Sequence, residues 1–181
     1  YLQFSQKTKN SIISLIILII LISSFFILKF ALQKEKIYTP KKIDNQIFTD
    51  FEVEELFEGK NVNFNNVFLG QNFYLLNIWS SWCEPCKDES EYLLELKNDN
   101  SITMIGINYK DKKKNALNFL KLYGNPFDKI FIDKQGTLSI NFGAYGVPET
   151  FLINNEKKVL RKYIGPLNEK DVYEIKKIIN N

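Results

Sequence analysis

The sequence predicts an α/β fold, in which helices flank a mixed central sheet, together with an N-terminal transmembrane helix. Two observations predict this arrangement. An uncharged apolar run of membrane-spanning length lies near the N-terminus. Beyond it, short apolar stretches alternate with stretches of helical periodicity, which indicates parallel β–α–β units with right-handed crossovers. We therefore predict a membrane segment in residues 1–32, a polar tether in residues 33–50 and a folded domain in residues 51–181.

The composition excludes several kinds of site. The chain has 181 residues, with two cysteines and no histidine. Without an imidazole group there is no Ser–His–Asp or Cys–His catalysis and no histidine-ligated metal or haem. Two cysteines cannot fill a tetrahedral zinc site or form the disulfide framework of a small secreted scaffold. We expect no metal.

The charge distribution argues against a nucleic-acid partner. Residues 1–42 contain seven lysines and one glutamate, which leaves 17 of the 24 basic and 20 of the 21 acidic residues in residues 43–181. The folded part is therefore mildly acidic, with Arg161 as its one arginine. Nucleic-acid-binding domains are instead strongly basic.

The apolar run in residues 10–28 contains no charged side chain. These nineteen residues form about 28 Å of helix, close to the hydrocarbon thickness of a bilayer. A buried core helix would show a polar stripe, and a signal peptide would have a shorter apolar region before a small-residue cleavage site. The run shows neither feature, so we predict an uncleaved, single-pass helix at about residues 11–28.

Charge counting does not fix the orientation of this helix. Lysines flank both ends of it, and the positive-inside count favours a cytoplasmic C-terminal side. Since the chain begins with Tyr1 rather than Met, we expect further N-terminal charge that this count omits. The polar residues 33–50 that follow include Pro40 and are typical of a tether. The acidic stretch 50–58 is compatible with an edge strand or a short helix.

The folded domain is predicted to contain five strands and three helices. The strands are short apolar runs bounded by polar residues, at residues 73–79, 102–108, 129–133, 150–154 and 159–163. The helices follow the cysteine pair and cover residues 113–123, which Gly124 ends, and 170–179. The last two strands are close enough in sequence for an antiparallel hairpin. This order of elements is that of the thioredoxin-like fold.

Both cysteines lie in residues 83–86 (Cys-Glu-Pro-Cys), between a predicted strand and a predicted helix. A helix N-terminus stabilises a thiolate on Cys83, and Pro85 suits the first turn. Cys86 lies near enough to attack a mixed disulfide at Cys83. A structural disulfide would restrict the unfolded chain little across so short a loop, and c-type haem attachment needs a histidine where Lys87 stands. We predict a redox-active dithiol and no separate cofactor.

Val147 and Pro148 precede the predicted strand at residues 150–154. A proline at the start of a buried strand is unfavourable for sheet pairing unless its peptide bond is cis. A cis-proline loop beside the dithiol would exclude metals and offer backbone groups to an extended substrate peptide. An ordinary edge-strand proline is the alternative. We predict substrate contact at these two residues and at Trp82 and Pro85.

Three glutamates lie near the dithiol in sequence or in the predicted fold. Negative charge raises the pKa of nearby thiols, and a partly buried carboxylate can carry the proton of Cys86. For Glu84 a solvated surface position is preferred, and for Glu89 surface and functional roles are both open. Glu149, directly after the proline, is the preferred proton carrier. Without histidine, a proton relay must use carboxylates or water.

Three blocks of sequence carry a resemblance to a known family. They are residues 76–86 (LNIWSSWCEPC), 106–111 (GINYKD) and 141–153 (NFGAYGVPETFLI), supported by residues 124–127 and 165–167. The first block alone is typical of any thioredoxin relative, and the other two are more specific. On these blocks the chain resembles the DsbE/CcmG family, membrane-tethered thioredoxin-like reductants of cytochrome c maturation. The resemblance covers roughly residues 72–168 and the N-terminal anchor.

The resemblance implies a function and a location. It implies Cys83 as attacking thiol, Cys86 as resolving thiol, Pro148 as cis proline, and Glu89 and Glu149 as active-site acids. The domain would reduce apocytochrome c or a maturation partner in the bacterial periplasm. A membrane electron donor of the DsbD/CcdA type would keep it reduced. The implied orientation places the N-terminus in the cytoplasm and the helix in the inner membrane, and an N-terminal β-hairpin is expected.

Two other functions remain open. One is a general membrane-tethered periplasmic reductase of the TlpA/ResA type. Only the second and third sequence blocks, residues 106–111 and 141–153, favour the DsbE/CcmG family over this type. The other is a docking module of the maturation machinery that has no turnover. The intact dithiol argues against that module, since docking needs neither sulfur.

Overall fold

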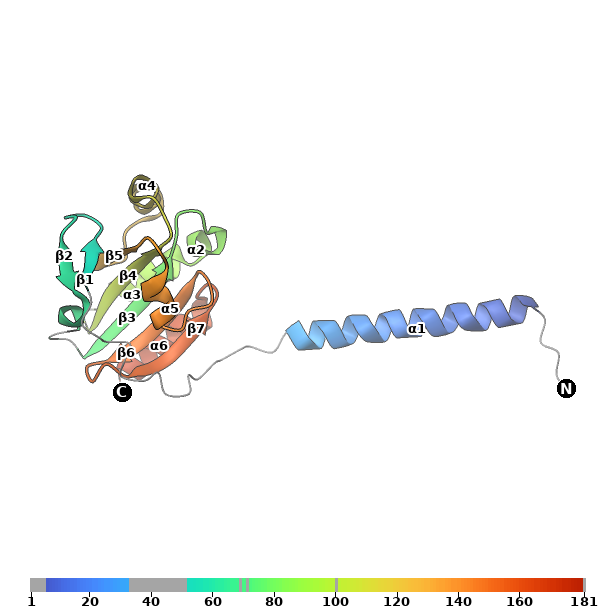
Figure 1. Ribbon diagram of the computed structural model, residues 1–181. Coiled ribbons are helices and arrows are strands. Elements are labelled where there is room, and N and C mark those ends of the chain that lie inside the picture. The colour runs from blue at the N-terminus through green and yellow to red at the C-terminus, as the bar shows by residue number, and fades with distance from the viewer. Residues whose placement is uncertain (1–5, 33–51, 69, 71, 100, 181) are drawn as a thin grey trace. The chain divides into compact units, whose positions relative to one another are not determined.

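The N-terminal helix and the folded domain are separate units of the computed structural model and are described one at a time (Figure 1). Helix α1 covers Gln6–Leu32, and its Asn10–Phe30 segment has the length and mean hydropathy (3.0) of a membrane span. Its large apolar side chains are exposed, as lipid contact requires. The structure describes residues 6–32, 52–68, 70, 72–99 and 101–180. The predicted tether, residues 33–50, lies outside them.

The folded domain is built on a mixed sheet of seven strands in the order β2-β1-β5-β4-β3-β6-β7. Strands β3, β4 and β5 are parallel to one another, and the other pairings are antiparallel. The strands are β1 Glu52–Glu55, β2 Asn61–Asn63, β3 Phe73–Trp79, β4 Ile102–Tyr109, β5 Lys129–Asp133, β6 Glu149–Asn154 and β7 Val159–Ile164. The predicted mixed sheet and closing hairpin are confirmed.

Helices cover both faces of the sheet, as predicted. The crossovers β3–β4 and β4–β5 step in the same direction, so right-handed connections place their helices on one face. That face packs Leu75 and Met104 against the helices, and the other face packs Leu76 and Ile105. The first face carries α2 Glu84–Asp88, α3 Ser90–Lys97, α4 Lys113–Tyr123 and α6 Glu169–Ile179, and the second carries the 3₁₀ helix η2 Phe64–Val67 and α5 Thr137–Asn141.

Strand register brings three loops to one end of the sheet. Trp79, at the end of β3, pairs with Asn108 near the end of β4. Ile78 pairs with Glu149, the first residue of the antiparallel strand β6. The segments after β3, after β4 and before β6 therefore meet at this end.

Three elements add to or differ from the sequence-based expectation. The stretch 50–58, left open between an edge strand and a short helix, contains strand β1, which lies one strand in from the edge and forms the expected N-terminal hairpin with the edge strand β2. The 3₁₀ helix η2 was not predicted. Helix α5, Thr137–Asn141, was not predicted, because five residues carry too little periodicity. Its first turn is held by the Asp133 carboxylate, which accepts hydrogen bonds from the N–H groups of Leu138 (3.3 Å) and Ser139 (2.8 Å).

Candidate active site

The cysteine pair lies at the strand-to-helix junction where the sequence places it. Cys83 is the N-cap residue of α2, and its Sγ accepts a hydrogen bond from the backbone N–H of Cys86 at 3.2 Å. Pro85 lies in the first turn. The two Sγ atoms are joined in a disulfide, and both cysteines are buried. The predicted helix continues as α3 after a break at Glu89.

The loop between β4 and α4 holds the segment that precedes Cys83. The Asp111 carboxylate accepts hydrogen bonds from the backbone N–H (2.7 Å) and hydroxyl (2.9 Å) of Ser81. The indole Nε1 of Trp82 donates to the carbonyl oxygen of Lys110 at 3.2 Å, while the side chain stays 58% exposed. Trp82 is thus a fixed apolar surface beside the disulfide, as substrate contact requires.

Replacing Asp111 by asparagine is expected to lower the free energy of unfolding by about 2 kcal/mol at pH 7, because one charged acceptor serves several donors. Partial burial opposes ionisation of this carboxyl, but the hydrogen bonds from Ser81 and its other donors outweigh it and lower its pKa from 3.8. Its stabilisation is therefore lost as the pH falls through that lowered pKa. Urea unfolding of the full chain in mild detergent, at pH 7 and below 4, measures both effects. Asp88→Asn, at an exposed position, is the control, and an equal loss there would contradict the anchoring role.

The peptide bond between Val147 and Pro148 is cis, as predicted. The carbonyl oxygen of Pro148 accepts a hydrogen bond from the N–H of Gly165 at 3.0 Å. Val147 is half-buried and packs against the core cluster that contains Cys83 and Cys86. The proline loop and the dithiol therefore lie at the same end of the sheet, and substrate contact at this loop stays a prediction.

Glu89 is a fully buried carboxyl on the dithiol face of the sheet. Its Oε1 accepts a hydrogen bond from Nδ2 of Asn77 at 2.9 Å, and its Oε2 accepts one from the backbone N–H of Leu167 at 3.0 Å. Burial raises the pKa of Glu89 to about 7, although these two hydrogen bonds oppose the shift. At neutral pH this group can both accept and donate a proton.

A small cavity of about 10 Å³ connects Glu89 with Cys86. This is about the volume that one water molecule needs. Asn77 Oδ1 and Trp79 Nε1, on residues that line the cavity, have no hydrogen-bond partner among the described residues. The cavity therefore offers the polar partners that a bridging water requires.

Glu149 is buried on the opposite face of the sheet from Glu89. Side chains alternate along a strand, and Glu149 shares its face with Phe151, which belongs to the second core cluster. Its Oε1 accepts hydrogen bonds from the N–H groups of Tyr145 (2.6 Å) and Gly146 (3.0 Å), and its Oε2 lies 2.8 Å from the Nζ of Lys162. The structure thus brings Glu89, but not Glu149, to the Cys86 side, and Glu149 anchors the proline loop.

The remaining acid, Glu84, is exposed and forms an ion pair with Lys87. This position agrees with the solvated-surface interpretation preferred from the sequence. Sequence reasoning missed Asn77 and Asp111. The signal for Asn77 is a polar residue inside an apolar strand, and the signal for Asp111 is its place in the block 106–111.

Comparison with known proteins finds a matching family and relatives of similar sequence. A family model described as Redoxin matches residues 43–179. The thiol:disulfide interchange protein CycY of Rhizobium leguminosarum is 45% identical over 92 residues, which cover 51% of this chain and 50% of that protein. The thiol:disulfide interchange protein DsbE of Vibrio cholerae is 35% identical over 125 residues, which cover 69% of this chain and 67% of that protein.

A solved structure shows the same fold. A crystal structure from Chlorobium tepidum, described as that of a candidate DsbE, superimposes with a TM-score of 0.62 at 23% identity, and covers 74% of this chain and 92% of that one. The thioredoxin-like fold predicted from the sequence is therefore confirmed. The chain spans between about half and two thirds of the length of the first curated relatives it matches.

Proposed function

We propose that this chain, which belongs to the DsbE/CcmG group of the Redoxin family, is a thiol:disulfide oxidoreductase. Its proposed substrate is the disulfide of apocytochrome c, or of a partner thiol protein, during cytochrome c assembly. One observation carries the proposal. The Cys83–Cys86 pair begins α2 beside the cis Val147–Pro148 peptide, with the buried Glu89 on the same side of the sheet.

The reaction is a two-electron thiol–disulfide exchange. The Cys83 thiolate attacks one sulfur of the substrate disulfide, so a mixed disulfide forms while the substrate S–S bond breaks and releases one thiolate. The Cys86 sulfur then attacks Sγ of Cys83, forms the intramolecular disulfide and releases the second substrate thiolate. The substrate gains two electrons and two protons, and the dithiol loses them.

Glu89 supplies the proton transfer that the second step needs. Cys86 is buried and must lose its proton before it can attack. Glu89 reaches it through the one-water cavity and has a pKa of about 7, so it can accept this proton near neutral pH. Since the chain has no histidine, a carboxylate takes the role that imidazole has in many other enzymes.

The proposed location is the bacterial inner membrane, with α1 as a single-pass anchor, the N-terminus in the cytoplasm and the domain in the periplasm. The length and apolar surface of α1 support the anchor. Regeneration of the dithiol requires a second thiol protein, for which a membrane electron donor of the DsbD/CcdA type is proposed.

A Cys86→Ser variant tests the proposed function. Without the resolving sulfur, the mixed disulfide at Cys83 cannot be released, so covalent complexes are expected to accumulate on non-reducing gels. Apocytochrome c or a maturation thiol protein in these complexes supports the proposal, whereas a broad set of proteins would assign a general reductase. The Cys83→Ser variant is the control that traps nothing. If Cys86→Ser traps no protein, the chain does not turn over a disulfide substrate, and the docking-module function is the one that fits.

A further inference from the structure

Four exposed lysines lie on the loop after β4 and the first turn of α4, and this loop binds the two residues that precede Cys83. This lysine cluster consists of Lys110, Lys112, Lys113 and Lys114. Within the described part of the chain no carboxylate is ion-paired with their ammonium groups. The one acid among them, Asp111, is hydrogen-bonded to Ser81 and to Asn108.

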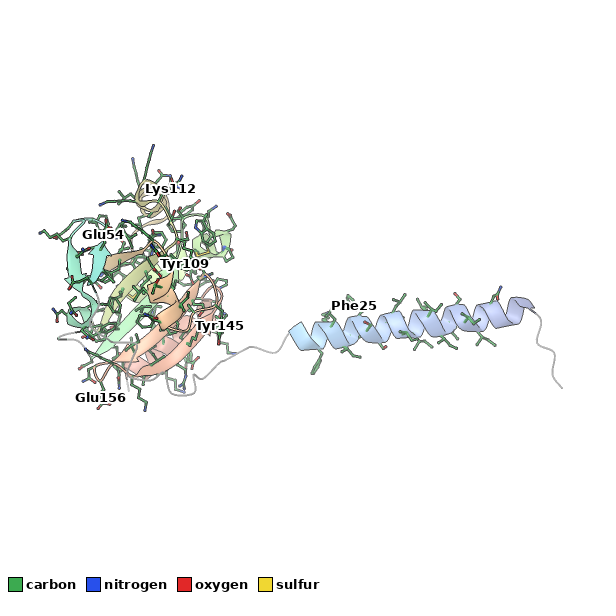
Figure 2. All side chains as sticks on the ribbon, in the orientation of Figure 1. Phe25, Glu54, Tyr109, Lys112, Tyr145 and Glu156 are labelled. Atoms are coloured by element: carbon green, nitrogen blue, oxygen red, sulfur yellow. A yellow bond between two sulfur atoms is a disulfide. The ribbon has the colours of Figure 1, made fainter. Side chains whose placement is uncertain are left out.

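The lysine cluster is held against the residues that precede Cys83. The carbonyl of Lys110 accepts the indole N–H of Trp82, and the neighbouring Asp111 binds Ser81. Figure 2 shows Lys112 at one end of the domain and Glu156 at the other, with Tyr109 between them. A protein segment that reaches Cys83 and covers Trp82 therefore meets the loop that carries the lysine cluster.

The acids around the site do not cancel this charge. Glu89 and Glu149 are buried, Glu84 is paired with Lys87, and the exposed Asp88 of α2 is a single charge against the four lysines. The remainder of the folded domain is mildly acidic, so the positive surface is a local feature and not a consequence of overall composition.

The position of the lysine cluster also opposes helix stability. Three of its members lie at the N-cap and first turn of α4, which carries no acid there. The positive end of the helix dipole disfavours cations at this position. A local preference of this kind is typically overridden where a residue serves a function.

We propose that the lysine cluster selects protein disulfides whose flanking residues are acidic, which rests on the proposed function and defines its substrate class. Opposite charge speeds the encounter of such a segment with the site and holds it while Cys83 attacks. The exposed indole of Trp82 supplies the adjacent apolar contact.

The test uses two synthetic peptides, each with one internal disulfide, flanked in one by glutamate and in the other by lysine. The full chain, reduced and embedded in nanodiscs of zwitterionic lipid, is expected to reduce the glutamate peptide about tenfold faster at low salt. This ratio should fall toward one at about 0.5 M salt. In the variant Lys112→Gln/Lys113→Gln/Lys114→Gln, the ratio is expected to drop to about two or less. Loss of these charges favours the helix, so the variant is expected to fold.

A matched variant removes the same charge elsewhere, as Lys121→Gln/Lys129→Gln/Lys158→Gln. These exposed lysines belong to the end of α4, the start of β5 and the β6–β7 turn, at the other end of the sheet. This variant is expected to keep the wild-type ratio, and an equal drop in both variants would overturn the inference.

Two further outcomes separate the inference from competing explanations. Equal reduction of both peptides by the wild type would reject the lysine cluster as a selector while leaving the proposed function intact. If, in addition, phosphatidylglycerol vesicles bound the wild type but not the Lys112/Lys113/Lys114 variant, the lysine cluster would be assigned to binding an anionic membrane surface. Reduction of neither peptide, with no protein trapped by Cys86→Ser, would instead reject the proposed function.

Discussion

Replacing Glu89 by glutamine is expected to slow the release of mixed disulfides by about 100-fold at pH 7, because proton transfer from Cys86 then lacks its acceptor. Stopped-flow measurement of substrate thiol release by the reduced chain gives this rate. The glutamine fits the site, since Asn77 can turn its amide and present its unpartnered Oδ1 to the new N–H₂ group. Glu91→Gln, at an exposed position on α3, is the control expected to keep the wild-type rate.

The same substitution is expected to change how stability depends on pH. The pKa of Glu89 is raised from 4.5 to about 7 in the folded chain, so the folded state holds a proton that the unfolded state has released. The stability from this proton is complete below pH 4.5, is lost as the pH rises to about 7 and amounts to about 3 kcal/mol. Urea unfolding across this range should show the loss for the wild type and not for Glu89→Gln. An unchanged slope and rate in the variant would reject Glu89 as the proton carrier.

Replacing Lys162 by methionine is expected to lower the free energy of unfolding by about 3 to 5 kcal/mol, since it leaves the buried carboxylate of Glu149 without its cation. Both side chains of this pair are 2% exposed. The Lys162 ammonium also donates to the carbonyl of Gly143 at 2.7 Å and lies 4.4 Å from the centre of the Tyr145 ring. Chemical unfolding followed by circular dichroism measures the loss.

A double substitution separates the charge effect from lost packing. Lys162→Met/Glu149→Gln removes both charges and is expected to recover more than half of the loss. Lys134→Met breaks the exposed pair with Glu54 and is expected to cost less than about 1 kcal/mol. If the double variant is no more stable than Lys162→Met, the pair does not act as a charge pair.

Glu149→Gln alone decides between the two roles considered for this acid. The sequence predicted a proton carrier for Cys86, whereas the structure places Glu149 on the other face of the sheet. We expect the pKa of Cys86 and the exchange rate to stay at their wild-type values. A shifted thiol titration would support the sequence-based role.

Much of the fold follows from local patterns that the sequence displays directly. The apolar run of β3, the periodic face of α4 and the hairpin-length connection between β6 and β7 each depend on neighbouring residues only. Gly124 ends α4 with φ 90°, a conformation that favours glycine. The cysteine pair and the cis proline were predictable for the same reason, since each is a short motif at an element boundary.

The partner of Glu149 could not be predicted, because it depends on a register shift. The β6–β7 pairing shifts by one residue between Leu152 and Ile153, so Lys162 faces Phe151. Without this shift Lys162 would face Thr150 on the opposite side of the sheet, away from Glu149. Apolar patterns set where strands begin and end, but they do not reveal such a shift.

The hydrogen bonds of Glu89 have a consequence for how the protein is made. One of its carboxylate oxygens is bound by Asn77 and the other by the backbone N–H of Leu167. Leu167 lies 78 residues after Glu89 in the chain. A growing chain that has left the ribosome only as far as α3 already contains both cysteines, but not the segments that enclose this acid. The tuned proton site therefore exists only after β6, β7 and the segment that reaches Leu167 have been synthesised and docked. Reactive sulfurs appear early in translation, and controlled catalysis appears late.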